Sequence, residues 1–496
     1  MNHSNFTRVI PLSIKSLLEL EGYNIFLLYK LSGTAGYLQI CRLSKFWDDF
    51  LFQNLPTQKP KKGKIMKKLS AKETVLLSIA LFSMFFGSGN LIFPPWMGFQ
   101  AVNTSMIALL GFSISAIIFP VLGVVAIAKW GGLVELSSNI SHKFALCFSI
   151  FAFSAIGPGL AIPRNAAVSF EMAVIPFTSN ISTTIRILYS VIFFAISYYL
   201  SLYPEKLMNT LGKILGPVLI IMMILVTIGC FIKAPHHLPD PSSAYKTNQL
   251  SQGFMDGYNT MDTIAALNFG AIISMNVRAK GIKDEKSVIS STISAGWIAG
   301  FFLFAIYTGM TLVGALSAGL FQNANNGANV LSNIVYHLFG TYGLIALAII
   351  YVLSCLTTCI GLLCSCSEFF SSISKIAYKK WITLFTIISC VVSIFGLDQI
   401  LTISVPILTT IYPVAMVLVI LGLLKDKMQR YPNTYPATIY TVTFISIIYS
   451  LNSINIQIPF ITNFILSFPP NKDLCWLIPS IIAFMIGMIT SKKKVH

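Results

Sequence analysis

The stretch Phe85-Phe86-Gly87-Ser88-Gly89-Asn90-Leu91-Ile92-Phe93-Pro94-Pro95 decides the fold. It lies inside an apolar segment that begins after Lys72, and ~15 residues of helix from there would place Gly87 roughly 22 Å into a bilayer. Helices break at that depth only where the freed backbone groups find other partners. Two glycines permit unwinding, and Ser88 and Asn90 can hydrogen-bond the broken backbone. We therefore expect a helix that is broken near the middle of a membrane.

The alternative is that these glycines only let neighbouring helices approach closely, as small residues often do in membranes. That packing favours small residues four positions apart, whereas Gly87 and Gly89 are two apart. The spacing favours the broken helix. The half-helix after such a break offers free N–H groups and a positive dipole end to an anion, and the half-helix before it offers carbonyls to a cation.

The composition excludes a soluble globular protein. Of 496 residues, 55% are hydrophobic and 10% are charged, whereas soluble domains have roughly a quarter of their residues charged. The net charge of +17 would suggest nucleic-acid binding in a soluble protein. In a membrane protein the same charge is typical of cytoplasmic loops.

We predict an all-α polytopic membrane protein of about twelve transmembrane helices. The apolar spans lie near 73–101, 104–128, 144–176, 184–202, 207–232, 254–277, 287–316, 329–367, 381–397, 399–424, 436–456 and 474–490. If alternate connections from Met66 onward lie on one side, that side holds twenty Lys and Arg residues against four on the other. The bias predicts that both ends of the core are cytoplasmic, and it accounts for the net charge without nucleic acid.

Residues 1–65 differ in kind from the rest of the chain. They carry the basic run Lys59, Lys61, Lys62 and Lys64, and they lack the pattern of a cleaved secretory signal. Met66-Lys67-Lys68 is typical of a natural start. We therefore interpret 1–65 as a basic extension that could result from an upstream start codon, with a segment lying on the membrane surface as the alternative.

A second interruption is expected in the sixth span, where Asp262 lies near mid-depth when counted back from Arg278. A carboxylate there is costly and is by default a functional candidate, although it could also be a buried structural Asp. The first and sixth spans enter from opposite sides, which is the arrangement of a 5+5 inverted repeat. We expect repeats at about 72–232 and 254–424, with two extra helices at about 436–490.

Two further spans carry polar candidates. Ser354, Thr357 and Thr358 in the eighth span could supply oxygen ligands to a hard cation. The alternative is that their hydroxyls bond the preceding turn of their own helix. Candidates for gating or proton coupling are the charged residues of the third and eighth spans, Arg164, Glu171 and Glu368.

These motifs resemble the bacterial branched-chain amino acid transport system II carriers, also called leucine-isoleucine-valine cation symporters. The resemblance covers Met66 to about Lys494. It rests on Phe86-Gly87-Ser88-Gly89-Asn90-Leu91-Ile92-Phe93-Pro94-Pro95, Ala161-Ile162-Pro163-Arg164, Val168-Ser169-Phe170-Glu171, Gly257-Tyr258, Thr260-Met261-Asp262, Leu356-Thr357-Thr358 and Ile360-Gly361-Leu362.

The resemblance implies a leucine-transporter-like fold with a site between broken helices 1 and 6. It implies that backbone groups at Gly87, Ser88 and Gly89 hold the substrate carboxylate, and that an unwound stretch from Asp262 to Leu267 receives the amino group. The implied substrate-binding residues are Gly87, Ser88, Gly89, Asn90, Asp262, Ala265, Ala266 and Leu267. The implied Na+ ligands are carbonyls of Ser83 and Phe86 together with Ser354, Thr357 and Thr358.

We thus expect import of Leu, Ile and Val across the bacterial inner membrane, driven by Na+ and without a cofactor. The lipid bilayer is the expected partner, and the sequence does not indicate the oligomeric state. One alternative couples the same transport to protons through Asp262, Glu171 or Glu368. A remote alternative is a polytopic membrane enzyme, but the six histidines form no cluster beyond His236-His237. A protein without enzymatic activity is therefore expected.

Overall fold

The computed structural model describes residues 69–178, 182–202, 221–232, 238–282, 284–321, 324–424, 431–468 and 472–491. Within these ranges every regular element is a helix, as predicted. Seven of the described helical stretches are long and apolar enough to cross a membrane. The predicted extension 1–65 lies outside the described residues. The count of twelve spans and the inverted repeat stay predictions.

The first predicted span is broken where the sequence places the break. It consists of α4 (Ala71–Phe85) and α5 (Ser88–Ala101), separated by Phe86 and Gly87. The amide of Gly87 donates to the Phe85 carbonyl at 2.9 Å, so its helical bond to the Ser83 carbonyl is not made. Pro94 and Pro95 lie inside α5 and do not end it.

The sixth predicted span is also broken, but one turn earlier than the sequence suggested. Helix α13 (Gln249–Tyr258) ends before a short connection, and α14 (Asp262–Ala279) begins at Asp262. The expected unwinding of 262–267 is therefore corrected to 259–261. The physical reason is Met261, which adopts the left-handed conformation with φ 66° and so turns the chain before Asp262.

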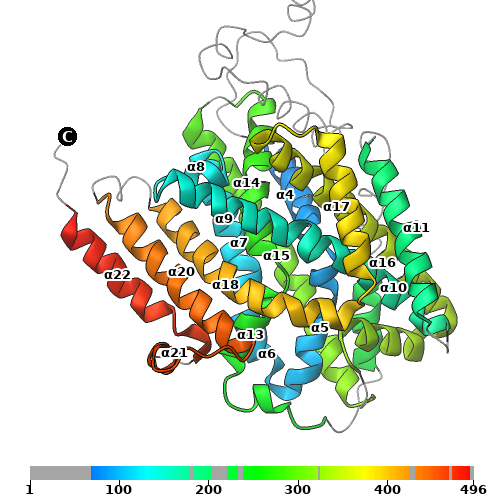
Figure 1. Ribbon diagram of the computed structural model, residues 1–496. Coiled ribbons are helices and arrows are strands. Elements are labelled where there is room, and N and C mark those ends of the chain that lie inside the picture. The colour runs from blue at the N-terminus through cyan, green and yellow to red at the C-terminus, as the bar shows by residue number, and fades with distance from the viewer. Residues whose placement is uncertain are drawn as a thin grey trace, which may run out of the picture. The chain divides into compact units, whose positions relative to one another are not determined.

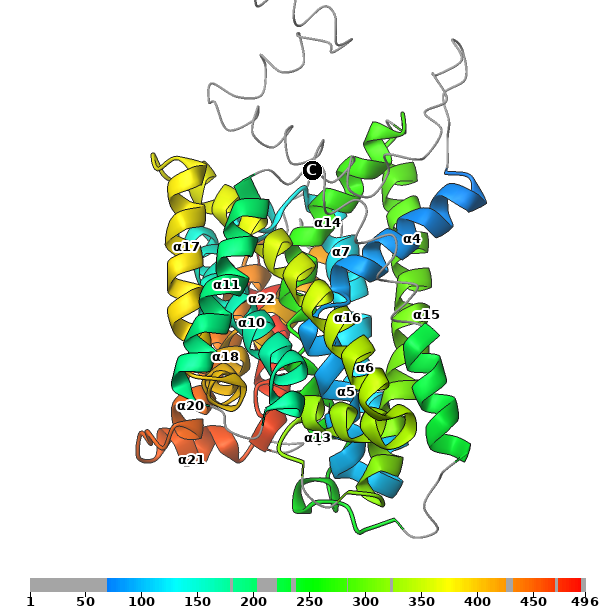
Figure 2. The ribbon, with the colours of Figure 1, turned by 90° about the vertical axis from the view of Figure 1, so that its right-hand side faces the viewer.

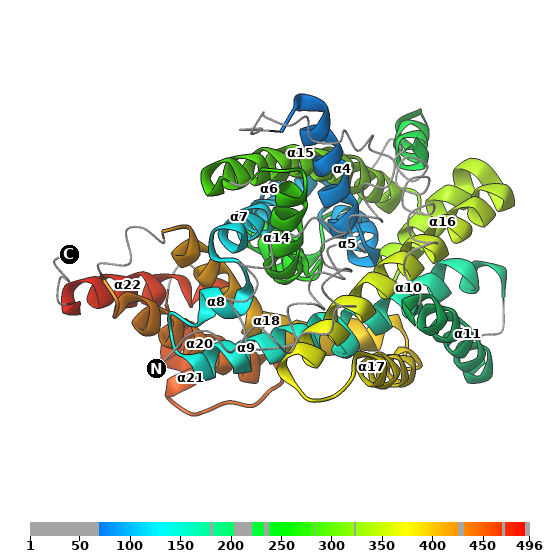
Figure 3. The same ribbon diagram turned by 90° about the horizontal axis from the view of Figure 1, so that it is seen from above.

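The two broken helices run in opposite directions. Figure 2 shows α4 and α14 in the upper half of the view, with α5 and α13 below them. Helix α14 packs along α7 (Phe119–Trp130), and seen from above α4, α7, α14 and α15 (Glu285–Ala318) lie close together (Figure 3).

Three more interruptions were not predicted. The second span contains a π-helical turn, Ile114–Ile118, between α6 (Ser105–Ser113) and α7. The third contains the π-helical turn Ala155–Gly159, where Gly157 leaves the helical conformation before Pro158. The eighth, α16 (Gly327–Ile373), is kinked at Gly340. The pair Gly157-Pro158 explains the interruption in the third span, because proline cannot continue the helical hydrogen bonds.

The remaining helices complete the bundle. Helix α10 packs on α16, and α18, α20 and α22 pack in sequence, side by side in Figure 1. Their bounds, with those of the shorter elements, are η1 (Val102–Thr104), α8 (Leu133–Ser137), α9 (His142–Ser154), α10 (Ala161–Ala173), η4 (Ile175–Phe177), α11 (Thr183–Leu202), Ile221–Ile232, η5 (Ser243–Tyr245), α17 (Tyr378–Ser393), α18 (Leu397–Leu423), α20 (Thr434–Ser453), α21 (Ile461–Leu466), η6 (Lys472–Leu474) and α22 (Leu477–Thr490).

Glycines hold α5 against α15. A side-chain carbon added at Gly314 would overlap the carbonyl oxygen of Pro95, and one added at Gly98 would overlap that of Thr311. Backbones can approach so closely only where small residues face each other. The contact fixes the half-helix α5, whose first turn forms part of the candidate site.

We expect Gly314→Ala to destabilise the protein, because the added methyl must push α15 away from α5. Overpacking of this kind costs ~1–3 kcal/mol. Thermal unfolding in detergent should show a lower midpoint for this variant. The control is Ser294→Ala on the exposed face of the same helix, which should unfold like the wild type. Equal midpoints for both variants would contradict this packing.

Candidate substrate and cation site

Asn90 joins the two helix breaks. It lies in the first turn of α5, where its Oδ1 accepts a hydrogen bond from the Gly87 amide at 3.2 Å. Its Nδ2 donates to Oδ2 of Asp262, the first residue of α14, at 2.5 Å. One side chain thus caps the broken first helix and holds the carboxylate of the broken sixth helix.

Tyr307 of α15 completes this buried cluster. Its hydroxyl accepts from Asn90 Nδ2 at 2.5 Å and donates to Asp262 Oδ2 at 3.3 Å. Asn90, Asp262 and Tyr307 are 2%, 3% and 0% exposed, so their polar atoms depend on each other rather than on water. Tyr307 was missed by the sequence analysis. The signal was a tyrosine midway along an apolar helix, whose hydroxyl needs a partner when it is buried.

Arg164 of α10 lies on the other side of the first break. A methyl group added at Gly89 would be 2.6 Å from its Nη2, so the guanidinium fills the space that this glycine leaves. Its Nη1 donates to the Asn259 carbonyl at 2.6 Å, and its Cζ lies 5.4 Å from the centre of the Phe93 ring. Its Nε is buried and has no hydrogen-bond partner among the described residues.

The site therefore presents two opposite charges at two broken helices. The guanidinium of Arg164 and the first amides of α5 form a positive region, since the first N–H groups of a helix lack partners within it. The carboxylate of Asp262 forms a negative region. A buried donor without a partner is costly unless a ligand satisfies it. The arrangement is complementary to a small zwitterion.

The predicted cation ligands come together in part. A methyl group added at Gly87 would lie 3.2 Å from the Thr358 methyl carbon and 3.6 Å from its hydroxyl oxygen, so Thr358 of α16 faces the first break. Thr357 and Thr358 donate their hydroxyl protons to the carbonyls of Leu353 and Ser354, at 2.8 and 3.1 Å. A hydroxyl that donates in this way keeps lone pairs that can bind a cation.

The other predicted substrate residues lie on two faces of α14. Ala266 packs on α7, where its methyl would lie 3.1 Å from a carbon added at Gly123. Leu267 is buried as well, whereas Ala265 is partly exposed. Asn268, which was not predicted, donates a hydrogen bond to the Ser365 hydroxyl of α16.

Among the described residues, Glu171 and Glu368 form no hydrogen bond with a residue of either helix break. Glu171 Oε2 accepts from Asn329 Nδ2 at 3.5 Å. Glu368 is near the end of α16, and its Oε1 is buried without a hydrogen-bond partner among the described residues. Arg164 and Glu171 have different hydrogen-bond partners, Asn259 and Asn329.

The chain has the fold of the leucine-transporter-like class of membrane transporters. It is similar to the inward-facing conformation of Mhp1, with a TM-score of 0.57 and 13% identity over 84% of this chain and 89% of that one. It is also similar to Mhp1, a nucleobase-cation-symport-1 family transporter, in a closed conformation with bromovinylhydantoin bound, with a TM-score of 0.53 and 14% identity over 84% and 91% of the two chains.

The chain belongs to the branched-chain amino acid transport protein family, whose profile matches residues 70–494. It is 34% identical to the branched-chain amino acid transport system 2 carrier protein of Pseudomonas aeruginosa, over 86% of this chain and 98% of that protein. It is 32% identical to the branched-chain amino acid permease BraB of Bacillus subtilis, over 85% and 96%. The resemblance found in the sequence is confirmed: the chain is a multi-pass membrane transport protein and not an enzyme.

We expect Tyr307→Phe to weaken substrate uptake several-fold. The change removes one hydroxyl and leaves Asn90 and Asp262 without a shared partner, and a lost buried hydrogen bond costs ~0.5–1.5 kcal/mol. Initial rates of labelled leucine uptake into proteoliposomes measure the effect. Tyr336→Phe is the matched control, because that ring is 57% exposed on α16. If both variants transport like the wild type, the hydroxyl has no part in the site.

Proposed function

We propose that this protein imports leucine, isoleucine and valine across the bacterial inner membrane by Na+ symport. The observation that carries the proposal is the pair of opposite charges at the two helix breaks. In this proposal the substrate carboxylate binds the amides of Ser88 and Gly89 and the free donor of Arg164, and the ammonium group binds Asp262. The names of the relatives, all branched-chain amino acid carriers or permeases, supply the substrate class.

The apolar part of the substrate lies, in this proposal, along α14 near Ala265 and Leu267. An apolar pocket discriminates one methylene by only ~1–3 kcal/mol, so leucine, isoleucine and valine share one site. Polar side chains are rejected more strongly, because they would have to leave water without gaining partners.

Na+ is the proposed coupling ion. The break exposes the carbonyls of Ser83 and Phe86, and Thr358 faces the same break from α16. Together with Ser354 and Thr357 they offer the oxygen ligands that a hard cation prefers. One Na+ that moves down ~100 mV gains about 2.3 kcal/mol, and a tenfold gradient adds about 1.4 kcal/mol. Their sum supports on the order of 500-fold accumulation of a zwitterion.

Proton coupling is the second candidate. It is favoured by one observation, the buried Oε1 of Glu368 that has no hydrogen-bond partner within the described ranges. Asp262 and Glu171 are the other candidate carriers of the proton.

The proposed orientation places both ends of the core in the cytoplasm. Lys280, after α14, pairs with Glu73 at the start of α4, with 3.9 Å between Nζ and Oε1. Lys129, at the end of α7, donates to the Leu423 carbonyl at the end of α18 at 3.2 Å. Because α7 and α14 pack in parallel, these basic residues share one side. Lys and Arg gather on the cytoplasmic side of membrane proteins.

Labelled leucine uptake into proteoliposomes tests the proposal, first under a Na+ gradient at clamped pH and then under a proton gradient without Na+. We expect accumulation only with the Na+ gradient. Thr358→Val should raise the Na+ concentration for half-maximal uptake by roughly tenfold, the loss of about 1.4 kcal/mol, because the variant keeps the shape but loses a ligand oxygen.

The control for this variant is Thr402→Val. The Thr402 hydroxyl also bonds the preceding turn, at 2.9 Å from the Asp398 carbonyl, but it lies on the exposed face of α18. Its Na+ dependence should match that of the wild type. Accumulation with the proton gradient alone would reject Na+ coupling in favour of the membrane carboxylates, and no accumulation under either gradient would reject the proposed substrate.

A further inference from the structure

Tyr412 of α18 has a buried hydroxyl group that lacks a hydrogen-bond partner among the described residues. The whole side chain is 0% exposed, so water does not replace that partner. Buried hydroxyls are nearly always paired, because leaving one unpaired costs ~1–3 kcal/mol. A hydroxyl that is left unpaired at this cost is a candidate for binding a ligand.

The hydroxyl of Tyr412 faces the second helix break. It lies near the Asp262 carboxylate, the Thr260 hydroxyl and the Thr263 amide, at the start of α14. The guanidinium of Arg164 is a further charged group close to it. Tyr412 therefore lies beside both of the opposite charges that form the candidate site.

The neighbours of this hydroxyl are already engaged in other hydrogen bonds. The Thr260 hydroxyl donates to a carbonyl of α13 at 2.9 Å and accepts from the Asp262 amide at 3.4 Å. Oδ2 of Asp262 accepts from Asn90 and from Tyr307. These bonds explain why Tyr412 is left unpaired. A ligand with N–H groups would find its phenolic oxygen available as an acceptor.

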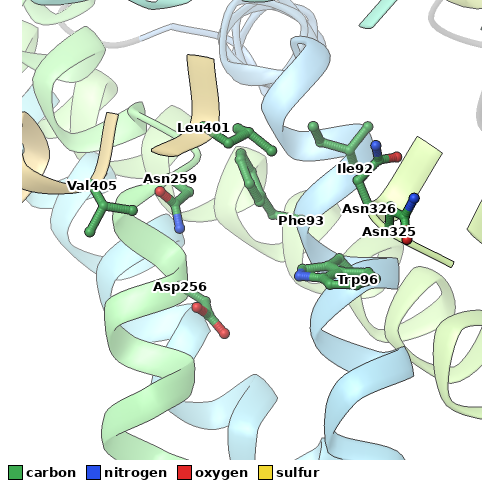
Figure 4. A pocket seen from close by; sticks show the side chains of 10 residues that line it. Ile92, Phe93, Trp96, Asp256, Asn259, Asn325, Asn326, Leu401 and Val405 are labelled. Atoms are coloured by element: carbon green, nitrogen blue, oxygen red, sulfur yellow. The ribbon is translucent and has the colours of Figure 1, made fainter. Parts of the chain in front are cut away.

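Tyr412 lies deeper in the protein than the pocket in Figure 4. That pocket has a volume of about 140 Å³ and lies between α5 and α13, with Leu401 and Val405 of α18 in its lining. Val405 and Tyr412 are seven residues apart, so they share one helix face and are about 10 Å apart along it. The Tyr412 ring stacks on Tyr258, the last residue of α13, with 4.4 Å between the ring centres. The stack holds Tyr412 at the level of the break at 259–261.

An ammonium group has more donors than Asp262 can readily pair. The group carries three N–H donors. In the proposed function it binds Asp262, one of whose oxygens already accepts two hydrogen bonds. An N–H group that stayed unpaired in this buried site would be costly. The phenolic oxygen of Tyr412 supplies an acceptor beside the carboxylate.

We propose that the Tyr412 hydroxyl binds the substrate ammonium group together with Asp262, and that it makes the site selective for a primary ammonium group. The proposal rests on the proposed function, since it concerns the same substrate in the same site. N-methylleucine has one N–H donor fewer than leucine. Its methyl group would replace the N–H that faces Tyr412, because the attraction to the charged carboxylate is the stronger one.

The variant Tyr412→Phe tests the proposal, because it removes one oxygen and keeps the stacked ring. The KM for labelled leucine uptake into proteoliposomes should rise by roughly tenfold, equivalent to about 1.4 kcal/mol. The matched control is Tyr258→Phe. It removes a hydroxyl from the other ring of the same stack, but that hydroxyl lies near Trp476 and Asp473. The KM of this variant should equal that of the wild type.

Inhibition of uptake by unlabelled leucine and by N-methylleucine tests the selectivity. In the wild type, N-methylleucine should inhibit roughly tenfold more weakly than leucine. In Tyr412→Phe the two compounds should inhibit about equally, because the acceptor that distinguishes them is gone.

Thermal unfolding in detergent separates a binding role from a structural one. Without leucine, Tyr412→Phe should unfold at the same temperature as the wild type or a higher one, because it removes an unpaired buried hydroxyl. Added leucine should raise the unfolding midpoint less in the variant than in the wild type, since a ligand that binds more weakly stabilises less.

The inference is overturned if Tyr412→Phe leaves the KM for leucine unchanged, or if the variant still discriminates against N-methylleucine as strongly as the wild type does. A lower unfolding midpoint of the variant without leucine also overturns it, because the hydroxyl would then have a structural role. Failure of the proposed function has a different result, in which the wild type does not accumulate leucine.

Discussion

The hydrogen bond between Asn90 and Asp262 is the interaction on which the site depends. Each break leaves backbone groups without helical hydrogen-bond partners. Such groups are costly in a membrane unless another group satisfies them. Asn90 satisfies the Gly87 amide with its oxygen and the Asp262 carboxylate with its nitrogen, 172 residues away. The two half-helices that begin at the breaks, α5 and α14, are thereby fixed relative to each other.

The surrounding helices give this junction its charge pattern. Helix α15 supplies Tyr307 to the acidic side, and α10 supplies Arg164 to the positive side. The close contact of α5 with α15 at Gly314 holds Asn90 of α5 beside Tyr307 of α15. A zwitterion with an apolar side chain matches both charges. The proposed function accounts for the burial of an arginine and an aspartate in a chain whose composition is 55% hydrophobic.

Much of the fold could be predicted, because membrane spans appear in the sequence as long apolar stretches and helix breaks appear as glycines. Gly87 marked the first break correctly. The second was placed at 262–267 but lies at 259–261, because it depends on a left-handed Met261 that sequence patterns rarely indicate.

The site was harder to predict. Asn90 and Asp262 were identified as separate candidates, but their contact with each other and with Tyr307 depends on packing between distant helices. The cation ligands and the roles of Glu171 and Glu368 stay predictions.

An experimental structure of the protein with leucine and Na+ tests the central claim most directly. The account predicts the amino acid between the two breaks, with its carboxylate at the amides of Ser88 and Gly89 and the guanidinium of Arg164. It predicts the ammonium group at Asp262, within hydrogen-bond distance of the carboxylate that Asn90 holds. Leucine bound away from both breaks, with the Asn90 and Asp262 side chains apart, would contradict it.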